Sequence, residues 1–498
     1  MKKLISIILT FSMIFSLCSV AFAEEVQDGC NGECGILPIV YVPGFGDGIY
    51  IDPESDSPTP IYPPSSSDIL KAIPDLVLAV FGVAIGSDAT FGKFATRAAN
   101  KLLEKIACDE NGDPVITNSS IDPISEPIFD YHQNVTDDID ERSYNYRYDW
   151  RLSPIDHAKG LKVYIEKVKK LTGHDEVAIV CHSQGNTVVA SYLELYGSEG
   201  IAKIAFLSPA FQGISILGSL YRKEADLSGK ADQLKFFVES VMPQGTGTDV
   251  VSLLLATLNI TGVTDGLLNF LQRYLSSQFD LIFDECLKPA FGNLAGTWCF
   301  VPDEYFDDAV EVMFDGREDA PVLEKIIYYH DNVQVKLAEI LQETLDSGTD
   351  IIICAGYNIS SIPVSLTPAN HSDFLIDTKY MSIGASCAPL GETLGDNYKQ
   401  AVECGHNHVS ADMQIDASTC AFPEYTWFFS GMNHNVFPLG YHRFLNAYLA
   451  ADERINVNTY EEYPQFMAID ENENLIPVTA NKEKDRGFLG FIANLLSK

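Results

Sequence analysis

The chain has 498 residues, of which 46% are hydrophobic, and its formal net charge is −36. This composition supports a folded globular protein, and the length suits one large domain with insertions or two domains. The strong negative charge argues against nucleic-acid binding and against electrostatic docking on anionic membranes, because those surfaces are negative as well.

The first 23 residues predict a secretory signal peptide. Two lysines precede an apolar run over residues 4–17, and the A-x-A sequence of residues 21–23 supplies a cleavage site. The apolar run is short for a helix that spans a bilayer. Cys18 lies in a poor lipoprotein sequence, so we expect cleavage rather than lipid attachment. The segment therefore predicts a secreted protein of bacterial type, with no transmembrane segment in the mature chain.

An apolar strand over residues 36–42 leads into residues 43–46, which read PGFG. A Gly-rich turn after a strand can aim backbone N–H groups at one point, as an oxyanion hole requires, although an ordinary Pro/Gly turn is the alternative. Residues from about 65 to 125 then predict a helical insertion, in which 76–85 are strongly apolar. Charged residues flank this run too closely for a membrane span, so we expect a buried or lipid-facing helix.

Residues 177–185 read VAIVCHSQG, and the rest of the chain is organised around them. Four apolar residues predict a buried strand, Ser183 follows at a tight turn, and the apolar spacing from Asn186 onward predicts a helix. A serine at the apex of a strand–turn–helix unit is typical of a nucleophile elbow. Gly185 is one of the small residues that the turn needs, and Cys181 replaces the first glycine of G-x-S-x-G. The alternative is an ordinary strand–loop–helix with a surface serine.

Strands and helices alternate before and after this unit. The alternation predicts a mostly parallel sheet with helices on both faces, and a site at the carboxyl ends of the strands. The strands stop between residues 214 and 347, where apolar and amphipathic helices predict a cap or lid that suits an apolar substrate. A second half of the core, or plain packing of apolar helices, is the alternative. The predicted boundaries are 24–213 and 348–450 for the two parts of the core, 214–347 for the cap and 451–498 for a peripheral tail.

A serine hydroxyl is a weak nucleophile that needs a base, and the base needs a carboxylate to orient it. In this kind of fold the chain order is serine, acid, histidine. His434 follows the last predicted strand and is the best candidate for the base. Asp412 fits a D-x-x-[IV] pattern and is favoured as the acid, whereas Asp416 suits the N-cap of a short helix. The candidates for the acid are Asp373, Asp377, Asp396, Asp412 and Asp416.

Cysteine and histidine gather in residues 404–408, which read CGHNH. The group resembles a set of metal ligands, but its spacing fits no common zinc module. We therefore favour a disulfide with two loop histidines, and we predict neither a metal nor a cofactor. Cys404 and Cys420 are close in sequence, whereas Cys181 and Cys354 belong to buried strands and are expected to be free thiols.

Six stretches in chain order resemble one known family. They are PIVYVPGF (38–45), YDWRLSP (148–154), VCHSQGN (180–186), FLSPAFQG (206–213), WCFVPD (298–303) and GMNH (431–434). Together they resemble the lecithin:cholesterol acyltransferase-like branch of the α/β-hydrolases. The resemblance implies an α/β-hydrolase fold and acyl-ester chemistry on lipids, as a lipase, phospholipase or acyltransferase.

The resemblance also implies roles for particular residues. Ser183 is the implied nucleophile and His434 the implied base, in agreement with the chain order, and the acid of a D-x-x-V-like motif falls on Asp412. The implied oxyanion donors are the backbone N–H groups of Phe45 and Gln184. Two features depart from the family: Cys181 stands where a glycine is usual, and the expected acid loop lacks Gly-Asp-Gly.

The sequence therefore predicts a secreted serine hydrolase that cleaves carboxylic esters, expected to be lipid acyl esters, through an acyl-enzyme. An O-acyltransferase would follow if an alcohol replaced water as the acceptor. A catalytically silent binding protein that keeps the fold is the alternative from another class, and a thioesterase or polyester depolymerase is a further one. Expected partners are the acyl-ester substrate and, transiently, a lipid interface.

Overall fold

The computed structural model describes residues 36–55, 57–121, 143–224, 273, 276–361 and 370–480. The predicted signal peptide, residues 225–272 of the predicted cap and the last part of the tail lie outside this set. In the described part of the chain, no helix is both long and apolar enough to cross a membrane.

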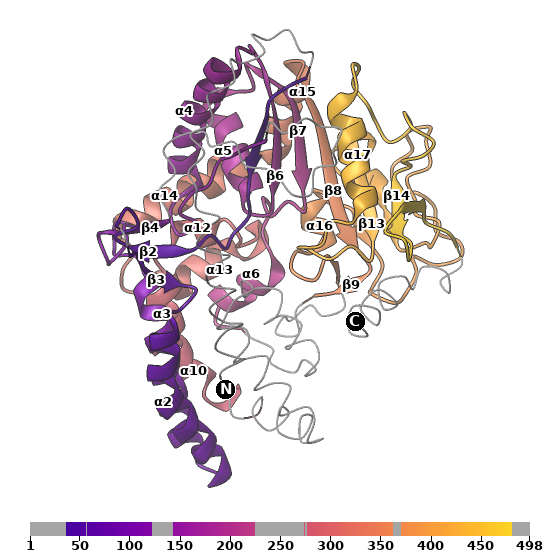
Figure 1. The fold of residues 1–498 in the computed structure, drawn as a ribbon. Helices are drawn as coiled ribbons and strands as arrows, with labels where there is room; N and C mark the ends of the chain where they lie inside the picture. The colour runs from indigo at the N-terminus through magenta and orange to yellow at the C-terminus, as the bar shows by residue number, and fades with distance from the viewer. Residues whose placement is uncertain are drawn as a thin grey trace, which may run out of the picture.

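An eight-stranded sheet forms the centre of the molecule (Figure 1), in the order β15-β14-β13-β8-β7-β6-β1-β5. Every neighbouring pair is parallel except β14 and β15, which are antiparallel. The strands are β1 (Ile39–Val42), β5 (Ser143–Asn145), β6 (Val177–His182), β7 (Ile201–Leu207), β8 (Asp350–Tyr357), β13 (Thr426–Ser430), β14 (Phe466–Ile469) and β15 (Leu475–Pro477). A mostly parallel sheet flanked by helices, with a serine elbow after a central strand, is the α/β-hydrolase fold, so the predicted fold class is confirmed.

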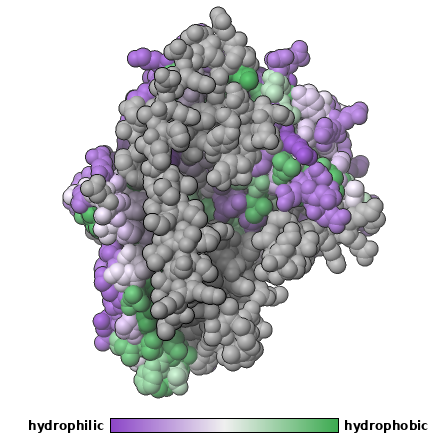
Figure 2. All heavy atoms as spheres, viewed as in Figure 1, coloured by the Kyte–Doolittle hydropathy of each residue, from purple (hydrophilic) through white to green (hydrophobic). Residues whose placement is uncertain are grey.

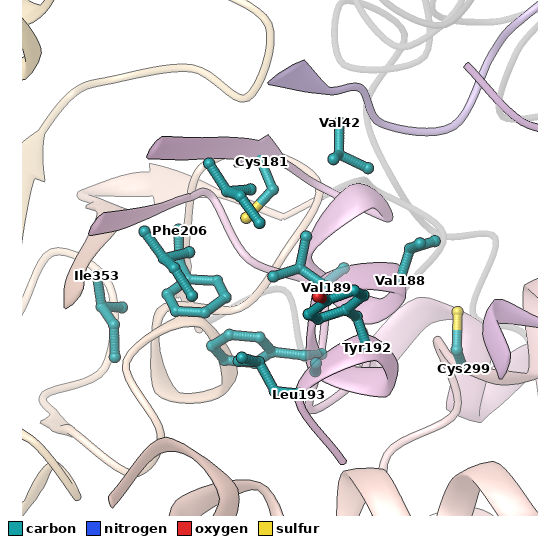
Figure 3. Close-up of a cluster of buried hydrophobic side chains, with 14 of the residues drawn as sticks. Val42, Cys181, Val188, Val189, Tyr192, Leu193, Phe206, Cys299 and Ile353 are labelled. Atoms are coloured by element: carbon teal, nitrogen blue, oxygen red, sulfur yellow. The ribbon is translucent and has the colours of Figure 1, made fainter. Parts of the chain in front are cut away.

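Helices cover both faces of this sheet because both faces of its central strands are apolar. Along β6, Ile179 and Cys181 pack with α4 (Pro154–Thr172) and α5 (Gly185–Tyr196), whereas Ala178 and Val180 belong to the cluster on the α17 side (Leu439–Ala450). Figure 3 shows the first cluster, in which Cys181 lies among the valines of α5 and Phe206. The packing on both faces holds the carboxyl ends of the strands in fixed positions.

In its described residues, the segment from 214 to 347 contains helices joined by turns and no strand. Its last helix, α15 (Leu337–Asp346), shares the main core with α5, so it serves as the crossover between β7 and β8. The π-helix His330–Gln334 also packs into the main core, through Val333. The remaining elements form a second core around Trp298. They are α6 (Ser215–Tyr221), α10 (Phe279–Ile282), the π-helix Phe283–Leu287, α11 (Lys288–Phe291), α12 (Ala295–Trp298), α13 (Asp303–Phe314) and α14 (Pro321–Tyr329).

A helical hairpin lies in the predicted insertion. Helices α2 (Ser66–Ala84) and α3 (Asp88–Leu103) approach closely at Gly82, where a Cβ would come within 2.6 Å of the Phe91 nitrogen. The 3₁₀ turn Glu104–Ile106 follows α3. The hairpin joins a small antiparallel sheet of β3 (Thr59–Tyr62), β2 (Ile49–Ile51) and β4 (Ser119–Ile121), and it projects from the body of the molecule (Figure 1).

Short elements fill the chain between β8 and α17. They are β9 (Ile359–Ser360), β10 (His371–Ser372), α16 (Thr378–Met381), β11 (Ser386–Cys387), β12 (Ile415–Asp416) and the 3₁₀ turns Ala417–Thr419 and Pro423–Tyr425. The thiols in this region differ from the expectation: Cys404 is exposed and Cys420 is buried, and both are free, so no disulfide closes the loop. Cys181 and Cys354 are buried free thiols, as predicted.

Candidate active site

Ser183 sits on a sharp turn between β6 and α5. Its backbone is in the left-handed region, with φ of +53°, which is uncommon for a residue with a side chain and marks a turn held by its surroundings. Gly185 permits this turn, because a Cβ there would lie 2.1 Å from the Val42 carbonyl oxygen. The Asn186 side chain donates hydrogen bonds to the carbonyl oxygens of Ser183 (2.8 Å) and Leu207 (3.1 Å). These contacts fix the predicted elbow.

Cys181 fits the elbow although a glycine is usual at its position. Its side chain points into the core between the sheet and α5, where it is fully buried. Its Sγ lies 3.2 Å from Asn186 Oδ1 and 3.5 Å from the Ala205 carbonyl oxygen, both of which can accept a weak S–H hydrogen bond. Burial holds the pKa of this thiol well above its ordinary value, so it stays protonated and is not a competing nucleophile.

Three side chains form a continuous hydrogen-bonded chain at the carboxyl ends of the strands. Ser183 Oγ is 3.0 Å from His434 Nε2, and His434 Nδ1 is 2.7 Å from Asp373 Oδ2. Because a carboxylate can only accept, Nδ1 carries the proton, and the neutral imidazole then accepts from the serine hydroxyl at Nε2. His434 is also held by its own backbone, since its N–H donates to the Asp373 carbonyl oxygen at 2.8 Å.

Asp373 is fully buried and is oriented by its own loop. Its Oδ1 accepts hydrogen bonds from the backbone N–H groups of Leu375 (3.0 Å) and Ile376 (2.8 Å), so only Oδ2 remains for the histidine. Gly356 near the end of β8 makes room for this loop, because a Cβ there would lie 2.7 Å from Asp373 Cβ. The strand end and the turn together aim one carboxylate oxygen at His434.

The structure does not bring Asp412 to His434, so the favoured assignment of the acid is corrected to Asp373. The carboxylate of Asp412 accepts hydrogen bonds from the Tyr357 hydroxyl at the end of β8 (3.1 Å) and from the Ser410 hydroxyl of its own loop (2.6 Å). Asp416 caps a 3₁₀ turn by accepting from the Ser418 N–H at 2.9 Å, as its alternative interpretation predicted.

One sequence signal pointed to Asp373. It is the first acidic residue after the end of β8, the strand that precedes the last predicted strand before His434. The D-x-x-[IV] pattern favoured Asp412, yet Asp373-Phe-Leu-Ile376 matches the same pattern. Because two of the candidate acids fit this short pattern, it cannot identify the acid without the path of the loop.

The loop of residues 43–47 lies against the serine, and the YDWR stretch holds it there. A Cβ on Gly44 would lie 2.7 Å from Ser183 Cβ, so only glycine allows this approach. Tyr148 donates from its hydroxyl to the Pro43 carbonyl oxygen (2.8 Å), and Trp150 donates from its indole to the Asp47 carbonyl oxygen (3.0 Å). The Phe45 ring also packs on Trp150, with centroids 4.2 Å apart.

The two predicted oxyanion residues flank Ser183 from different elements. Phe45 follows Gly44, and Gln184 is the residue after the serine. Among the described residues, neither backbone N–H donates a hydrogen bond to another protein group, so both are available to a ligand. The Gln184 side chain is anchored separately, because its Nε2 donates to the carbonyl oxygens of Trp150 (3.0 Å) and Gly296 (2.7 Å).

Two carboxylates near the site, the half-buried Asp47 and the buried Asp377, have raised pKa values. Burial raises the pKa of Asp47, and the Arg147 guanidinium 3.1 Å away opposes that shift. Burial also raises the pKa of Asp377, which accepts hydrogen bonds from the Ser215 N–H (2.9 Å) and the Asn370 side chain (2.7 Å). Asp377 therefore links the start of α6 to the loop that carries Asp373.

The family model described as lecithin:cholesterol acyltransferase matches residues 140–245, the stretch that holds the aromatic strand, the elbow and β7. The predicted resemblance is therefore confirmed over this stretch. No curated protein matches the chain.

Among solved structures, a match is "The crystal structure of Tle4-Tli4 complex", at 16% sequence identity. The match covers 37% of this chain and 48% of that chain, with a TM-score of 0.19. A likeness this low carries no argument about the fold or the activity.

Proposed function

We propose that the protein is a serine hydrolase that cleaves lipid acyl esters. The observation that carries the proposal is the chain of hydrogen bonds from Ser183 through His434 to Asp373 at a strained elbow, an arrangement suited to making a hydroxyl nucleophilic. The match to the lecithin:cholesterol acyltransferase family supports an acyl ester of a lipid as the substrate.

In the proposed reaction, Ser183 Oγ attacks the ester carbonyl carbon while His434 Nε2 takes the hydroxyl proton. The negative charge that develops on the carbonyl oxygen is stabilised by the N–H groups of Phe45 and Gln184. Asp373 stabilises the imidazolium, which then protonates the leaving alcohol as the ester bond breaks. His434 then takes a proton from a water molecule, whose oxygen attacks the carbonyl carbon of the acyl-enzyme. When the bond to Ser183 Oγ breaks, His434 returns the proton to that oxygen and the carboxylic acid is released.

An alcohol in place of water at the second step would make the enzyme an O-acyltransferase. The description of the matching family names such a transfer, so this is the second candidate function. The two activities share every residue of the first half-reaction. They are separated by whether an added long-chain alcohol yields a new ester in addition to free fatty acid.

The α2 helix supports contact with a lipid interface. Its buried side carries small residues and the carboxylates of Asp68 and Asp75, whereas its large apolar side chains face outward. Val77 is 62% exposed and Phe81 is 54% exposed. Figure 2 shows this hydrophobic patch at the projecting end of the hairpin. In Figure 1 the hairpin extends beyond α6 and β9, the elements that follow the carboxyl ends of β7 and β8.

Hydrolysis of nitrophenyl esters of increasing acyl length by the wild type and by Ser183→Ala tests the proposal. We expect turnover to rise with acyl length and to be lost in the variant, and we expect a fluorophosphonate probe to label only the wild type. Preference for the shortest esters would contradict the lipid assignment. Absence of both turnover and labelling would contradict the serine mechanism and favour a silent member of the fold. We also propose secretion, to be tested by finding the N-terminus of the mature protein at Glu24.

A further inference from the structure

Two histidines and a glutamate meet near the amino end of β13, whereas Ser183 lies at the carboxyl ends of the strands. His406 and His408 come from the loop between β11 and β12, and Glu424 comes from the 3₁₀ turn before β13. One ligand atom from each lies within 4.8 Å of the others. Since β13 separates Glu424 from His434, and its five residues span about 17 Å, this cluster is independent of the candidate active site.

The hydrogen bonds of Gln465 determine which ring nitrogen of His408, the buried member of the cluster, carries the proton. The Gln465 amide nitrogen donates to the carbonyl oxygens of Pro423 (2.7 Å) and Thr426 (3.0 Å), so its Oε1 must face the other way. That oxygen is 2.7 Å from His408 Nδ1, which must therefore be the protonated nitrogen. A neutral His408 then presents the lone pair of Nε2 toward the cluster.

This lone pair faces a second acceptor. His408 Nε2 is buried and has no hydrogen-bond partner among the described residues, and Glu424 Oε1, on a partly exposed side chain, lies 3.4 Å from it. Two acceptors that face each other with no donor between them favour a cation at that point. Glu424 Oε1 is also 2.8 Å from His406 Nδ1, so one carboxylate oxygen serves both imidazoles.

The His408 imidazole and the Glu424 carboxylate are each fixed by a hydrogen bond at their second polar atom, as metal ligands usually are. The other ring nitrogen of a metal-bound histidine normally donates to an oxygen, as His408 does to Gln465. The second oxygen of Glu424 accepts from the Asn458 side chain at 3.2 Å, which leaves Oε1 for the cluster. Tetrahedral zinc, with bonds of about 2.0–2.1 Å, separates its ligand atoms by roughly 3.3 Å. His408 Nε2 and Glu424 Oε1 are 3.4 Å apart, whereas His406 Nδ1 and Glu424 Oε1 are 2.8 Å apart, so the exposed His406 side chain has to move slightly outward to admit the ion.

We propose that His406, His408 and Glu424 bind one zinc ion, with the fourth position open to water. Nitrogen and oxygen ligands in this ratio suit zinc rather than calcium or magnesium, which prefer oxygen alone. The ion fastens the long irregular segment between β11 and β12 to the start of β13. Its effect is therefore on stability, because the ion binds the folded chain and not the unfolded one.

Titration of the metal-stripped full chain with zinc tests this site, with any histidine tag removed and excess magnesium present to occupy surface carboxylates. We expect one bound zinc ion per chain and a rise in the unfolding temperature. His406→Ala, at an exposed position that tolerates substitution, and Glu424→Gln should each weaken binding more than about tenfold and abolish the rise.

Two variants of the same loop serve as controls. Asn407→Ala changes an exposed residue whose side chain, within the described part of the chain, hydrogen-bonds to the Val409 backbone alone, and Cys404→Ser removes the neighbouring thiol. Both should bind zinc as the wild type does. No binding by the wild type, equal binding by His406→Ala, or loss of binding in Cys404→Ser would each overturn the proposed three-ligand site.

Discussion

Asp373 and Asp412 offer a direct test at the scale of single residues. Only Asp373 contacts His434, at 2.7 Å, so Asp373→Asn should put the imidazole in the wrong tautomer and lower kcat by roughly 10³–10⁴-fold. Asp412→Asn weakens hydrogen bonds with Ser410 and Tyr357, neither of which touches His434, and should lower kcat less than about tenfold. The measurement is turnover of a soluble nitrophenyl ester, with thermal unfolding to check that both variants fold. A larger loss in Asp412→Asn than in Asp373→Asn would return the acid's role to Asp412.

The local sequence pattern predicted Ser183 and His434 but not the third member of the hydrogen-bonded chain, Asp373. Ser183 was predicted because strand, turn and helix are contiguous in sequence, and His434 because it directly follows a strand. Asp373 lies 16 residues beyond the end of β8, and its position depends on a loop whose path is set by contacts with Gly356 and with its own backbone. The same limit applies to Glu424 and the two loop histidines, which are brought together only by the fold.

At the scale of elements, the base of the α2–α3 hairpin depends on one buried carboxylate. Burial alone would raise the pKa of Asp68, but hydrogen bonds from Lys105, Ser65 and Lys71 outweigh it and lower the pKa to about 2. Because this value is below that of the unfolded chain, near 3.8, the ionised group stabilises the fold above about pH 4. That contribution is lost as the pH falls from about 4 to 2.

Asp68→Asn should therefore lower the free energy of unfolding by about 2 kcal/mol near neutral pH and by much less near pH 2. Urea unfolding over this pH range measures the difference between variant and wild type. Asp88→Asn, in the exposed first turn of α3, is the matched control, and its difference from the wild type in free energy of unfolding should not change with pH in this way. A difference for Asp68→Asn that does not shrink on acidification would contradict the role given to its charge.

The hairpin also shows what periodicity leaves open. The apolar run of residues 76–85 predicted a helix that is buried or lipid-facing, and the sequence could not separate the two. The structure turns the small residues and Asp75 toward α3, where Asp75 meets Lys101 at 2.6 Å, and leaves the larger apolar side chains outside. Which side of a helix is covered depends on its partner, and α3 here covers Ala79 and Val83 with Phe91 but also holds Asp75 through Lys101.

For the whole molecule, the exposed apolar side chains of the hairpin and the net charge of −36 make opposite contributions to binding at an anionic membrane surface. The exposed apolar side chains of α2 favour insertion into any lipid interface, whereas the negative charge is repelled by anionic lipids. We therefore expect faster hydrolysis on zwitterionic than on anionic vesicles at low salt. Added salt should reduce the difference in hydrolysis rate between the two kinds of vesicle, because at 0.1 M it screens the repulsion beyond a Debye length of about 10 Å.

The apolar part of this balance is tested with Val77→Ser/Phe81→Ser. Both side chains are more than half exposed, so the double change should reduce the ratio of vesicle to soluble-ester turnover by roughly tenfold. Val163→Ser on α4 removes a side chain that is equally exposed, at 59%, but lies outside the hairpin. It should leave the ratio unchanged. Equal losses in the two variants would mean that general surface hydrophobicity, rather than the projecting hairpin, brings the enzyme to lipid.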